Sequence, residues 1–450
     1  MKLKLRIIGA IVMLMAMTPM VNAQETYSFS LKEAQIFALE HNYDIRNAIT
    51  DIEIAREKVK ETVATGLPQI SGSVGYTDYL EIPTQLIPGE FFGLPAGEFA
   101  EVQFGTQHNA TWSADVNQMI FNGQYIVGLQ ASRAYLSLSE TSYEKSEIEI
   151  KDMIAKAYYP VIILRENRMV FDSTLQSLDK MLYETTEYYK AGFVEETDVD
   201  QLQLLKSDME VTLTNIENQL EIAQNTFKYL MGINADAEVI LTDKIEDLMS
   251  NLEREALIQK PFDYNNHIDF KMLENQRALA ELQLKLDRSE YYPNLNAFYS
   301  YSQNAMRNEF NFFSSSEKWY PTQILGLQMN VPIFSSGYRR HKAQQSKLAI
   351  EKIKVQEDQL AQGLSLRVKT ARVEFNNAFL IFKNKERALS NSDKIYKKTE
   401  TKYREGLSTS LELQQTYNQY LSSQIDYLTS MLDLLTKRAE LEKELTPVEY

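Results

Sequence analysis

Two short stretches decide the fold: Tyr-Lys-Ala-Gly-Phe-Val at residues 189–194 and Tyr-Arg-Glu-Gly-Leu-Ser at residues 403–408. Each stretch follows a long window of helical periodicity and precedes another. Glycine readily closes a helix because it adopts a positive φ without a clash at Cβ. The side chains that could cap the next helix follow each glycine; they are Thr197, Asp198, Ser408, Thr409 and Ser410. The two stretches therefore predict the tips of two long helical hairpins.

The helical windows on both sides of the tips are much longer than ordinary globular helices. The windows before the tips cover residues 124–190 and 338–405, which corresponds to roughly 100 Å of helix at 1.5 Å per residue. In the return windows, residues 195–231 and 410–445, apolar side chains recur every three or four positions. This spacing is typical of coiled coils, whether the partner helix belongs to the same chain or to another.

Four strands are predicted where the apolar period changes from about 3.6 to 2, after Pro68 and Pro293. The alternating apolar residues are Ile70, Val74 and Tyr76; Ala110, Trp112, Ala114 and Val116; Leu295, Ala297, Tyr299 and Tyr301; and Leu325, Leu327, Met329 and Val331. A loop of about 27 residues separates the first pair of strands, and a shorter loop separates the second pair. Before the first pair, residues 31–66 have a helical pattern, with Ser30 and Glu33 as a capping box.

The two halves of the sequence repeat the same order of features. Asp44 and Asp269 lie 225 residues apart, as do Pro68 and Pro293, and the offset is 214 at the tips. A deletion in the second loop explains the change of offset. We predict a signal peptide at 1–23, a first repeat at 24–233 (helix, two strands, long helix, return helix), a connector in an equatorial region at 234–262 with a short strand at 238–241, and a second repeat at 263–450.

The N-terminal sequence has the features of a signal peptide. Lys2, Lys4 and Arg6 precede an apolar run over residues 7–17, and Val-Asn-Ala follows at 21–23. The run is too short for a membrane anchor, which needs about 20 residues. Because the remaining sequence has no apolar run of that length, we expect any membrane crossing to use β-strands.

Composition excludes several functional classes. The 450 residues include no cysteine, so we expect no disulfide, no thiolate chemistry and no lipid anchor of the lipoprotein type. A net charge of -15 disfavours nucleic-acid binding. The four histidines are isolated from one another, and no phosphate-binding loop or nucleophile motif is present. We therefore predict neither an enzyme nor a metal or cofactor site.

Four strands are too few for a closed transmembrane barrel, since the smallest such barrels have about eight. Because an open sheet edge cannot face lipid, an exported chain of this kind should pool its strands with other copies. Three copies would give twelve strands that continue into a helical cylinder. The aromatic residues at or near the strand ends fit a membrane girdle or ordinary buried positions; those assigned to the girdle are Tyr76, Trp112, Tyr299, Tyr301 and Trp319.

The order of these features resembles the TolC-like outer-membrane efflux factor family over essentially the whole mature chain. Each half has an Asn/His-x-Asp-apolar stretch, a Pro-led strand, a strand that ends near Ile-Phe and Gly, a long helix and a Tyr-x-x-Gly-apolar tip. The resemblance implies a mainly α-helical homotrimer whose twelve-stranded β-barrel crosses the outer membrane of a Gram-negative bacterium and whose α-barrel crosses the periplasm. It also implies a passive exit duct for efflux or type I secretion, opened by a periplasmic adaptor (membrane fusion protein) and an inner-membrane pump of the RND, ABC or MFS type.

The resemblance assigns roles to residues near both tips. Adaptor docking falls on Ala191, Gly192, Phe193, Glu405, Gly406 and Leu407, although the glycines could also be helix stops only. The family's periplasmic aperture corresponds to Tyr403 and Glu412, which match it. Ser408 and Gln415 depart from it, because they replace a basic residue and a second carboxylate. Asp198 and Asp200 could supply the missing charge or simply favour the start of a helix.

A periplasmic coiled-coil adaptor or a structural stalk without a pore is the alternative function. Two hairpins with strands between the helices fit such proteins less well than they fit a channel. The acidic composition predicts a cation-preferring pore. The sequence leaves the cargo open among drugs, metal ions, peptides and proteins.

Overall fold

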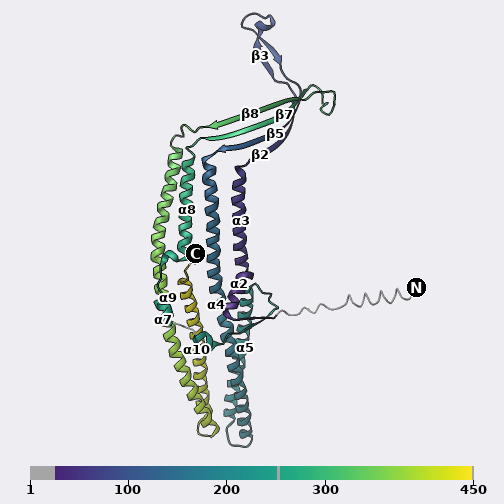
Figure 1. Cartoon of the computed structure of the whole chain (residues 1–450). Helices are drawn as coiled ribbons and strands as arrows, with labels where there is room; N and C mark the ends of the chain where they lie inside the picture. The colour runs from purple at the N-terminus through teal and green to yellow at the C-terminus, as the bar shows by residue number, and fades with distance from the viewer. Residues whose placement is uncertain (1–25, 251–253, 448–450) are drawn as a thin grey trace, which may run out of the picture. The chain divides into compact units, whose positions relative to one another are not determined.

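The computed structural model describes residues 26–250 and 254–447, so the predicted signal peptide at 1–23 lies outside the described residues. Contacts divide the chain into two units (Figure 1). Unit 1 contains the described residues up to Ile49, Tyr143–Asp269 and those from Ala361 onward, and unit 2 contains Thr50–Ser142 and Phe270–Leu360. Both units therefore draw on both halves of the sequence.

The predicted long helices are confirmed. α4 (Gly123–Lys190) has 68 residues and continues through Pro160, and α9 (Tyr338–Arg404) has 67 residues. The return helices are α5 (Glu196–Met231) and α10 (Ser410–Glu444). No helix within the described ranges is both long enough and apolar enough to cross a membrane.

The hairpins of unit 1 pack against each other through the apolar stripes of the return helices. Leu202, Leu205 and Met209 of α5 and Leu413 and Tyr417 of α10 are buried in one apolar cluster. The Tyr417 hydroxyl lies 3.5 Å from the Met209 sulfur. A second cluster surrounds Tyr158, Phe227, Phe375 and Leu434 and joins both hairpins to the N-terminal elements. The repeated spacing of threes and fours thus packs helices of the same chain together.

Two short strands and two short helices complete unit 1. β1 (Thr26–Phe29) pairs in parallel with β6 (Glu238–Leu241), at the position expected for a short strand in the connector. α6 (Ile245–Ser250) and α7 (Arg254–Gln259) follow, before the 3-10 turn η2 (Tyr264–Asn266). The parallel partner β1 was not expected from the sequence.

The expectation of one continuous helix over residues 31–66 is wrong. α2 (Leu31–His41) begins at the predicted capping box of Ser30 and Glu33, and α3 (Tyr43–Thr65) begins after a break at Asn42. Asn42 leaves the helical region with φ -61° and ψ 139°. Its Oδ1 accepts hydrogen bonds from the backbone N–H groups of Asp44 (2.8 Å) and Ile45 (3.3 Å), so Asn42 caps the second helix.

Asn42 also ties this break to the end of the first return helix. Its Nδ2 donates to the Leu230 carbonyl oxygen over 2.7 Å, and the side chain is only 3% exposed. Nearby, Gly232 ends α5 with φ 71°, and a Cβ at this residue would collide with the backbone of His41. The close approach of the two chain segments therefore requires glycine at position 232.

Unit 2 is built around one antiparallel sheet with strand order β2-β5-β7-β8 (Figure 1). The strands are β2 (Gln69–Asp78), β5 (His108–Phe121), β7 (Asn294–Arg307) and β8 (Tyr320–Asn330). α8 (Ile268–Ser289) leads into β7. The loop between the first two strands, which the sequence presents as irregular, contains the hairpin of β3 (Thr84–Pro88) and β4 (Phe99–Gln103) with the 3-10 turn η1 (Gly89–Phe92) between them.

The Asn42 cap gives a direct stability test. Asn42→Ala removes both cap hydrogen bonds and leaves the Leu230 carbonyl oxygen without its donor, so we expect a loss of about 2–4 kcal/mol. The midpoint of thermal unfolding, followed by circular dichroism, should fall. Asn47→Ala, an exposed position in α3, is the matched control and should change little. Equal midpoints for the two variants would contradict the role of Asn42.

Candidate functional site: a two-faced sheet and two helical tips

The register of the sheet collects side chains of one kind on each face. Val116 pairs with Ile70 and Tyr299, and Tyr299 pairs with Leu325. Because directly paired residues share a face and successive residues alternate, this row defines an apolar face. The apolar face contains Ile70, Val74, Tyr76, Ala110, Trp112, Ala114, Val116, Phe121, Leu295, Ala297, Tyr299, Tyr301, Ala305, Leu325, Leu327 and Met329. Its polar members are Gln118, Gln303 and Gln323, together with Asp78, His108 and Arg307 at the end of the sheet next to the loops.

The neighbouring row defines a polar face. Asp115 pairs with Ser71 on β2 and with Ser300 on β7. This face contains Gln69, Ser71, Ser73, Thr77, Asn109, Thr111, Ser113, Asp115, Asn117, Asn294, Asn296, Ser300, Ser302, Asn304, Thr322, Gln328 and Asn330, with Met119, Phe298, Met306, Tyr320 and Ile324 as its larger apolar or aromatic members. One sheet thus offers chemically opposite surfaces.

The apolar face is exposed in the single chain. Ile70, Val74 and Leu325 are 77%, 87% and 82% exposed. Contiguous apolar surface of this kind marks a membrane or protein contact rather than a water-facing surface.

Hydrogen bonds between side chains order the polar face. The Ser73 and Ser113 hydroxyls are 2.9 Å apart, and Ser113 donates to Asp115 Oδ2 over 2.8 Å. On the same face, between β5 and β7, Thr111 donates to Asn304 Oδ1 over 2.9 Å. These bonds cross from β2 to β7, so the polar side chains form a connected hydrophilic surface.

The aromatic residues predicted for a membrane girdle lie in two places, on the apolar face and at the end of the sheet next to the loops. Trp112 and Tyr301 pack edge to face on the apolar face with ring centroids 5.5 Å apart, and Tyr299 lies one step further along β7 on the same face. Tyr76 lies near the end of β2 and bonds His108 Nδ1 over 3.1 Å. Trp319 precedes β8, and its ring lies 6.3 Å from that of Phe312.

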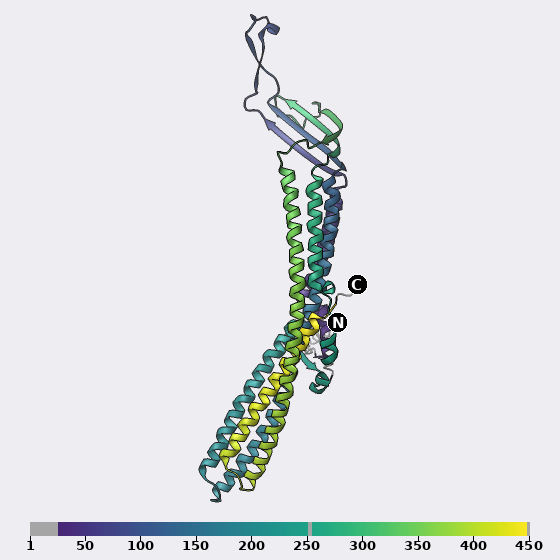
Figure 2. The ribbon, with the colours of Figure 1, turned by 90° about the vertical axis from the view of Figure 1, so that its left-hand side faces the viewer.

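Both tips have the same backbone geometry, the Schellman motif. Gly192 has φ 79°, and the Phe193 N–H donates to the Tyr188 carbonyl oxygen over 2.9 Å. Gly406 has φ 71°, and the Leu407 N–H donates to the Lys402 carbonyl oxygen over 2.7 Å. The tips lie beside each other at one end of unit 1 (Figure 2).

The tips present apolar side chains to the outside. Phe193 and Leu407 follow the two glycines and are 79% and 72% exposed. Ala191 and Glu405, which precede the glycines, are also exposed. Each tip therefore displays one large apolar side chain on a sharply defined turn.

The caps after the two tips differ from each other. Thr409 caps α10, as predicted, by accepting the Glu412 N–H over 3.2 Å. For α5 the N-cap is Glu195 instead of the expected Thr197 or Asp198. Asp198 takes the third helical position and accepts the Glu195 N–H over 3.3 Å.

Of the residues assigned to the aperture, Tyr403 joins the two hairpins. Its hydroxyl lies 3.3 Å from the Thr185 hydroxyl on α4. The pKa of the Tyr403 hydroxyl is raised above its ordinary value, chiefly because the hydroxyl is buried. The hydrogen bond with Thr185 opposes this shift, and the negative charge of Asp198 adds to it. Thr185 was not found from the sequence, because no local signal pairs residues 218 positions apart.

The carboxylates assigned to the aperture differ in their contacts. Glu412 stays within its own hairpin and accepts a hydrogen bond from the Ser408 hydroxyl. Asp200 is exposed on α5. The structure thus brings Tyr403 close to Asp198, while Ser408 donates to Glu412.

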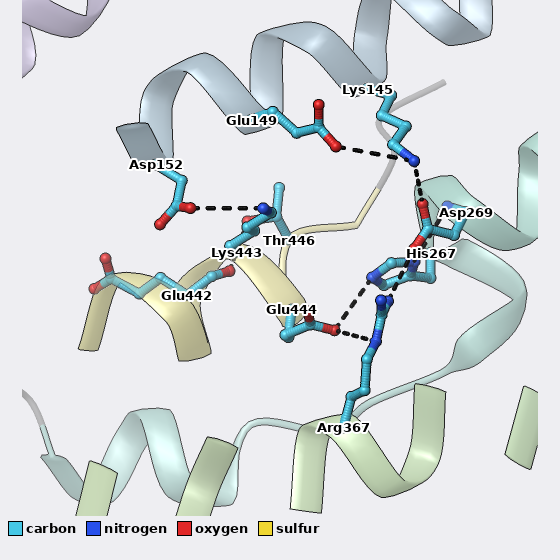
Figure 3. Close-up of polar contacts among 10 residues, drawn as sticks. All are labelled: Lys145, Glu149, Asp152, His267, Asp269, Arg367, Glu442, Lys443, Glu444 and Thr446. Carbon is cyan, nitrogen blue, oxygen red and sulfur yellow. Dashed lines mark hydrogen bonds and ion pairs between the residues drawn. The ribbon is translucent and has the colours of Figure 1, made fainter. Parts of the chain in front are cut away.

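A charged network lies at the start of α8, in unit 1 (Figure 3). His267 caps α8, since its Nδ1 accepts the Asp269 N–H over 3.2 Å. The Asp269 carboxylate binds Lys145 of α4 and Arg367 of α9, each at 2.9 Å. Arg367 also lies 3.3 Å from Glu444 of α10. We call these five residues the α8 network; it links four helices. His267 lies 225 residues after Asn42, at the corresponding cap.

The α8 network predicts a pH-dependent contribution to stability. Burial by itself raises the pKa of Asp269, but the hydrogen bonds from Lys145 and Arg367 outweigh it and hold the pKa below its usual value of 3.8. The stabilisation is therefore present above that value and is lost as the pH falls through the lower folded-state pKa. We expect Asp269→Asn to cost about 1–2 kcal/mol near neutral pH.

Urea unfolding of the wild type and of Asp269→Asn, compared between about pH 7 and about pH 3, measures this effect. The difference between the two proteins should shrink as the pH falls. Asp208→Asn, an exposed position on α5, is the control. A difference that is constant with pH would contradict the assignment to Asp269.

A four-stranded sheet with opposite faces, in a chain whose long helices form paired hairpins, defines a TolC-like architecture. A family model described as outer membrane efflux protein matches residues 37–233 and 264–445. The chain belongs to this outer membrane efflux protein family, whose members are not enzymes, and its location is the outer membrane.

Individual relatives are distant. The pyoverdine export outer membrane protein OpmQ of Pseudomonas aeruginosa is 24% identical over 217 residues, which cover 47% of this chain and 43% of OpmQ. The cation efflux system protein CusC of Escherichia coli O157:H7 is 22% identical over 317 residues, covering 67% of this chain and 60% of CusC. The matched part thus spans about half the length of these relatives. A crystal structure of CusC superposes with a TM-score of 0.71 at 14% identity, covering 93% of this chain and 92% of that one.

Proposed function

We propose that the chain is the outer-membrane exit duct of a tripartite efflux or type I secretion system, a passive conduit from periplasm to exterior. The observation that carries the proposal is the pair of opposite faces on one four-stranded sheet. The apolar face suits the lipid of the outer membrane, and the hydrogen-bonded polar face suits a water-filled lumen. Family membership supports the same function.

The proposed assembly is a homotrimer with a twelve-stranded β-barrel and an α-helical barrel. β2 and β8 are the edges of the sheet, each with one partner strand among the described residues. The helices attached to these edges also carry exposed apolar side chains in unit 2, such as Ile54 on α3 and Val355 on α9. A sister copy on each side would pair the strand edges and cover these helices together.

We further propose that a periplasmic adaptor docks at the tips, through Ala191, Gly192, Phe193, Glu405, Gly406 and Leu407. Exposed apolar side chains on hydrogen-bonded turns are the kind of feature on which a helical partner can anchor. The inner-membrane pump that works with this adaptor would be of the RND, ABC or MFS type. The names of OpmQ and CusC refer to pyoverdine and cations respectively, so the proposal leaves the cargo open.

The aperture is proposed to involve Tyr403, Glu412, Asp198 and Asp200. The Tyr403 hydroxyl meets Thr185 across the hairpins, and it is near Asp198. Opening would have to break or rearrange this contact. The resemblance implies a basic clasp where this chain has Ser408, whose hydroxyl donates to Glu412 instead. Glu412 forms no ion pair with any described residue.

The division of the chain into a first repeat at 24–233, a connector at 234–262 and a second repeat at 263–450 also stays a proposal. The two matched segments of the family model, 37–233 and 264–445, support it. The corresponding helix caps at Asn42 and His267 support it as well.

Planar bilayers test the conduit directly. Purified full-length protein should insert and conduct ions, and native mass spectrometry from detergent should give three times the mass of one chain. The alternatives, a periplasmic adaptor or a stalk without a pore, predict a protein that leaves the bilayer insulating. An insulating bilayer with a monomeric mass would refute the proposal.

Tip variants test adaptor docking. Phe193→Asp and Leu407→Asp place a charge where apolar contact is proposed, so we expect reduced export in cells and weaker pull-down of the adaptor encoded with this protein. Val211→Asp, on an exposed apolar position of α5 away from the tip, is the control. Export and pull-down equal to wild type in both tip variants would contradict docking at these turns.

A further inference from the structure

The charged side chains of the sheet are distributed very unevenly. Within β2, β5, β7 and β8, one side chain on the polar face is charged at neutral pH, and it is Asp115. The other two, Asp78 and Arg307, both pair with His108 in one row on the opposite face, at the end of the sheet next to the loops. Asp115 is therefore a single carboxylate on a face whose other polar side chains are hydroxyl and amide groups.

Asp115 lies near the middle of the polar face and is held in place. Its neighbours across the sheet are Ser71 and Ser300. Ser113 donates to its Oδ2 over 2.8 Å, and Ser300 also hydrogen-bonds the carboxylate. Among the described residues no cation forms an ion pair with Asp115. The carboxylate is thus fixed by neutral donors, and its charge is not compensated by a neighbouring base.

An uncompensated carboxylate on the wall of a pore acts on the ions that pass it. A pore with low-dielectric walls concentrates the field of charges on its surface and raises the local concentration of counter-ions. In a three-fold assembly each copy contributes the same side chain at the same height, so three carboxylates would form a ring. Rings of acidic side chains favour cations over anions in other channels.

We propose that Asp115 sets the cation preference of the strand-lined part of the conduit. The inference rests on the proposed channel function and adds to it the residue that discriminates between ions by charge. Small cations and cationic solutes are the substrate class that this position would favour. The hydroxyl groups around it would contact passing solutes without distinguishing their charge.

Reversal potentials in planar bilayers under a KCl gradient test the role of Asp115. The ratio of K⁺ to Cl⁻ permeability should fall severalfold in Asp115→Asn, which keeps the size and an acceptor oxygen for Ser113. Asp115→Glu restores the charge and should restore the preference. Asp78→Asn, the same change on the opposite face of the same sheet, should leave the wild-type ratio.

The outcomes separate this inference from the proposed function. If Asp115→Asn conducts with the wild-type permeability ratio, the role of Asp115 is overturned and the channel function stands. If the wild type itself does not conduct, the channel function fails and the inference fails with it. Circular dichroism and native mass measurements on each variant verify that a change of selectivity does not come from misfolding.

Discussion

The backbone groups at the edges of the four-stranded sheet impose the constraint on which the rest of the account depends. Among the described residues, β2 pairs with β5 alone and β8 with β7 alone. Each unpaired N–H or C=O group costs several kcal/mol in lipid, where no water replaces the missing partner. A sheet with an apolar face therefore needs further strands before it can enter a membrane. Sister copies of the chain are the simplest source, because the β2 edge of one copy can pair with the β8 edge of the next.

The alternation of side chains along each strand creates the two faces and decides which face each polar side chain reaches. Val116 and Asp115 are neighbours in the sequence, yet they point to opposite sides of β5. Moving the register of one strand by one residue would bring polar side chains to the apolar face. The hydrogen bonds from Ser73 through Ser113 to Asp115, and from Thr111 to Asn304, hold the observed register from the polar side.

Much of the fold could be predicted from the sequence because its signals are local. The tips follow from Gly192 and Gly406, since the Schellman turn at each tip needs a residue with a positive φ. Helix lengths follow from uninterrupted apolar spacing, and strand positions from the change of period after Pro68 and Pro293. The alternating residues of each strand predict a polar and an apolar face. They do not predict the register, that is, which residues pair across neighbouring strands.

The features that were missed depend on contacts between distant residues. The helix break at Asn42 is fixed by its bond to the Leu230 carbonyl oxygen, 188 positions away. β1 exists because β6 lies beside it, and Tyr403 meets Thr185 only once both hairpins have formed. The hairpin of β3 and β4 was hidden by the prolines of its loop, which resemble irregular structure. The functional roles of the tips, the aperture and the aromatic residues remain predictions, since they depend on partners.

The central claim is that the apolar face of the sheet meets lipid and the polar face meets water. Because the chain has no cysteine, single cysteines can be placed along β5 from Ala110 to Asn117 and labelled in reconstituted membranes. The account predicts alternation: a water-soluble, membrane-impermeant maleimide should modify positions 111, 113, 115 and 117 and spare positions 110, 112, 114 and 116. Uniform labelling, or labelling of the even-numbered positions instead, would contradict it.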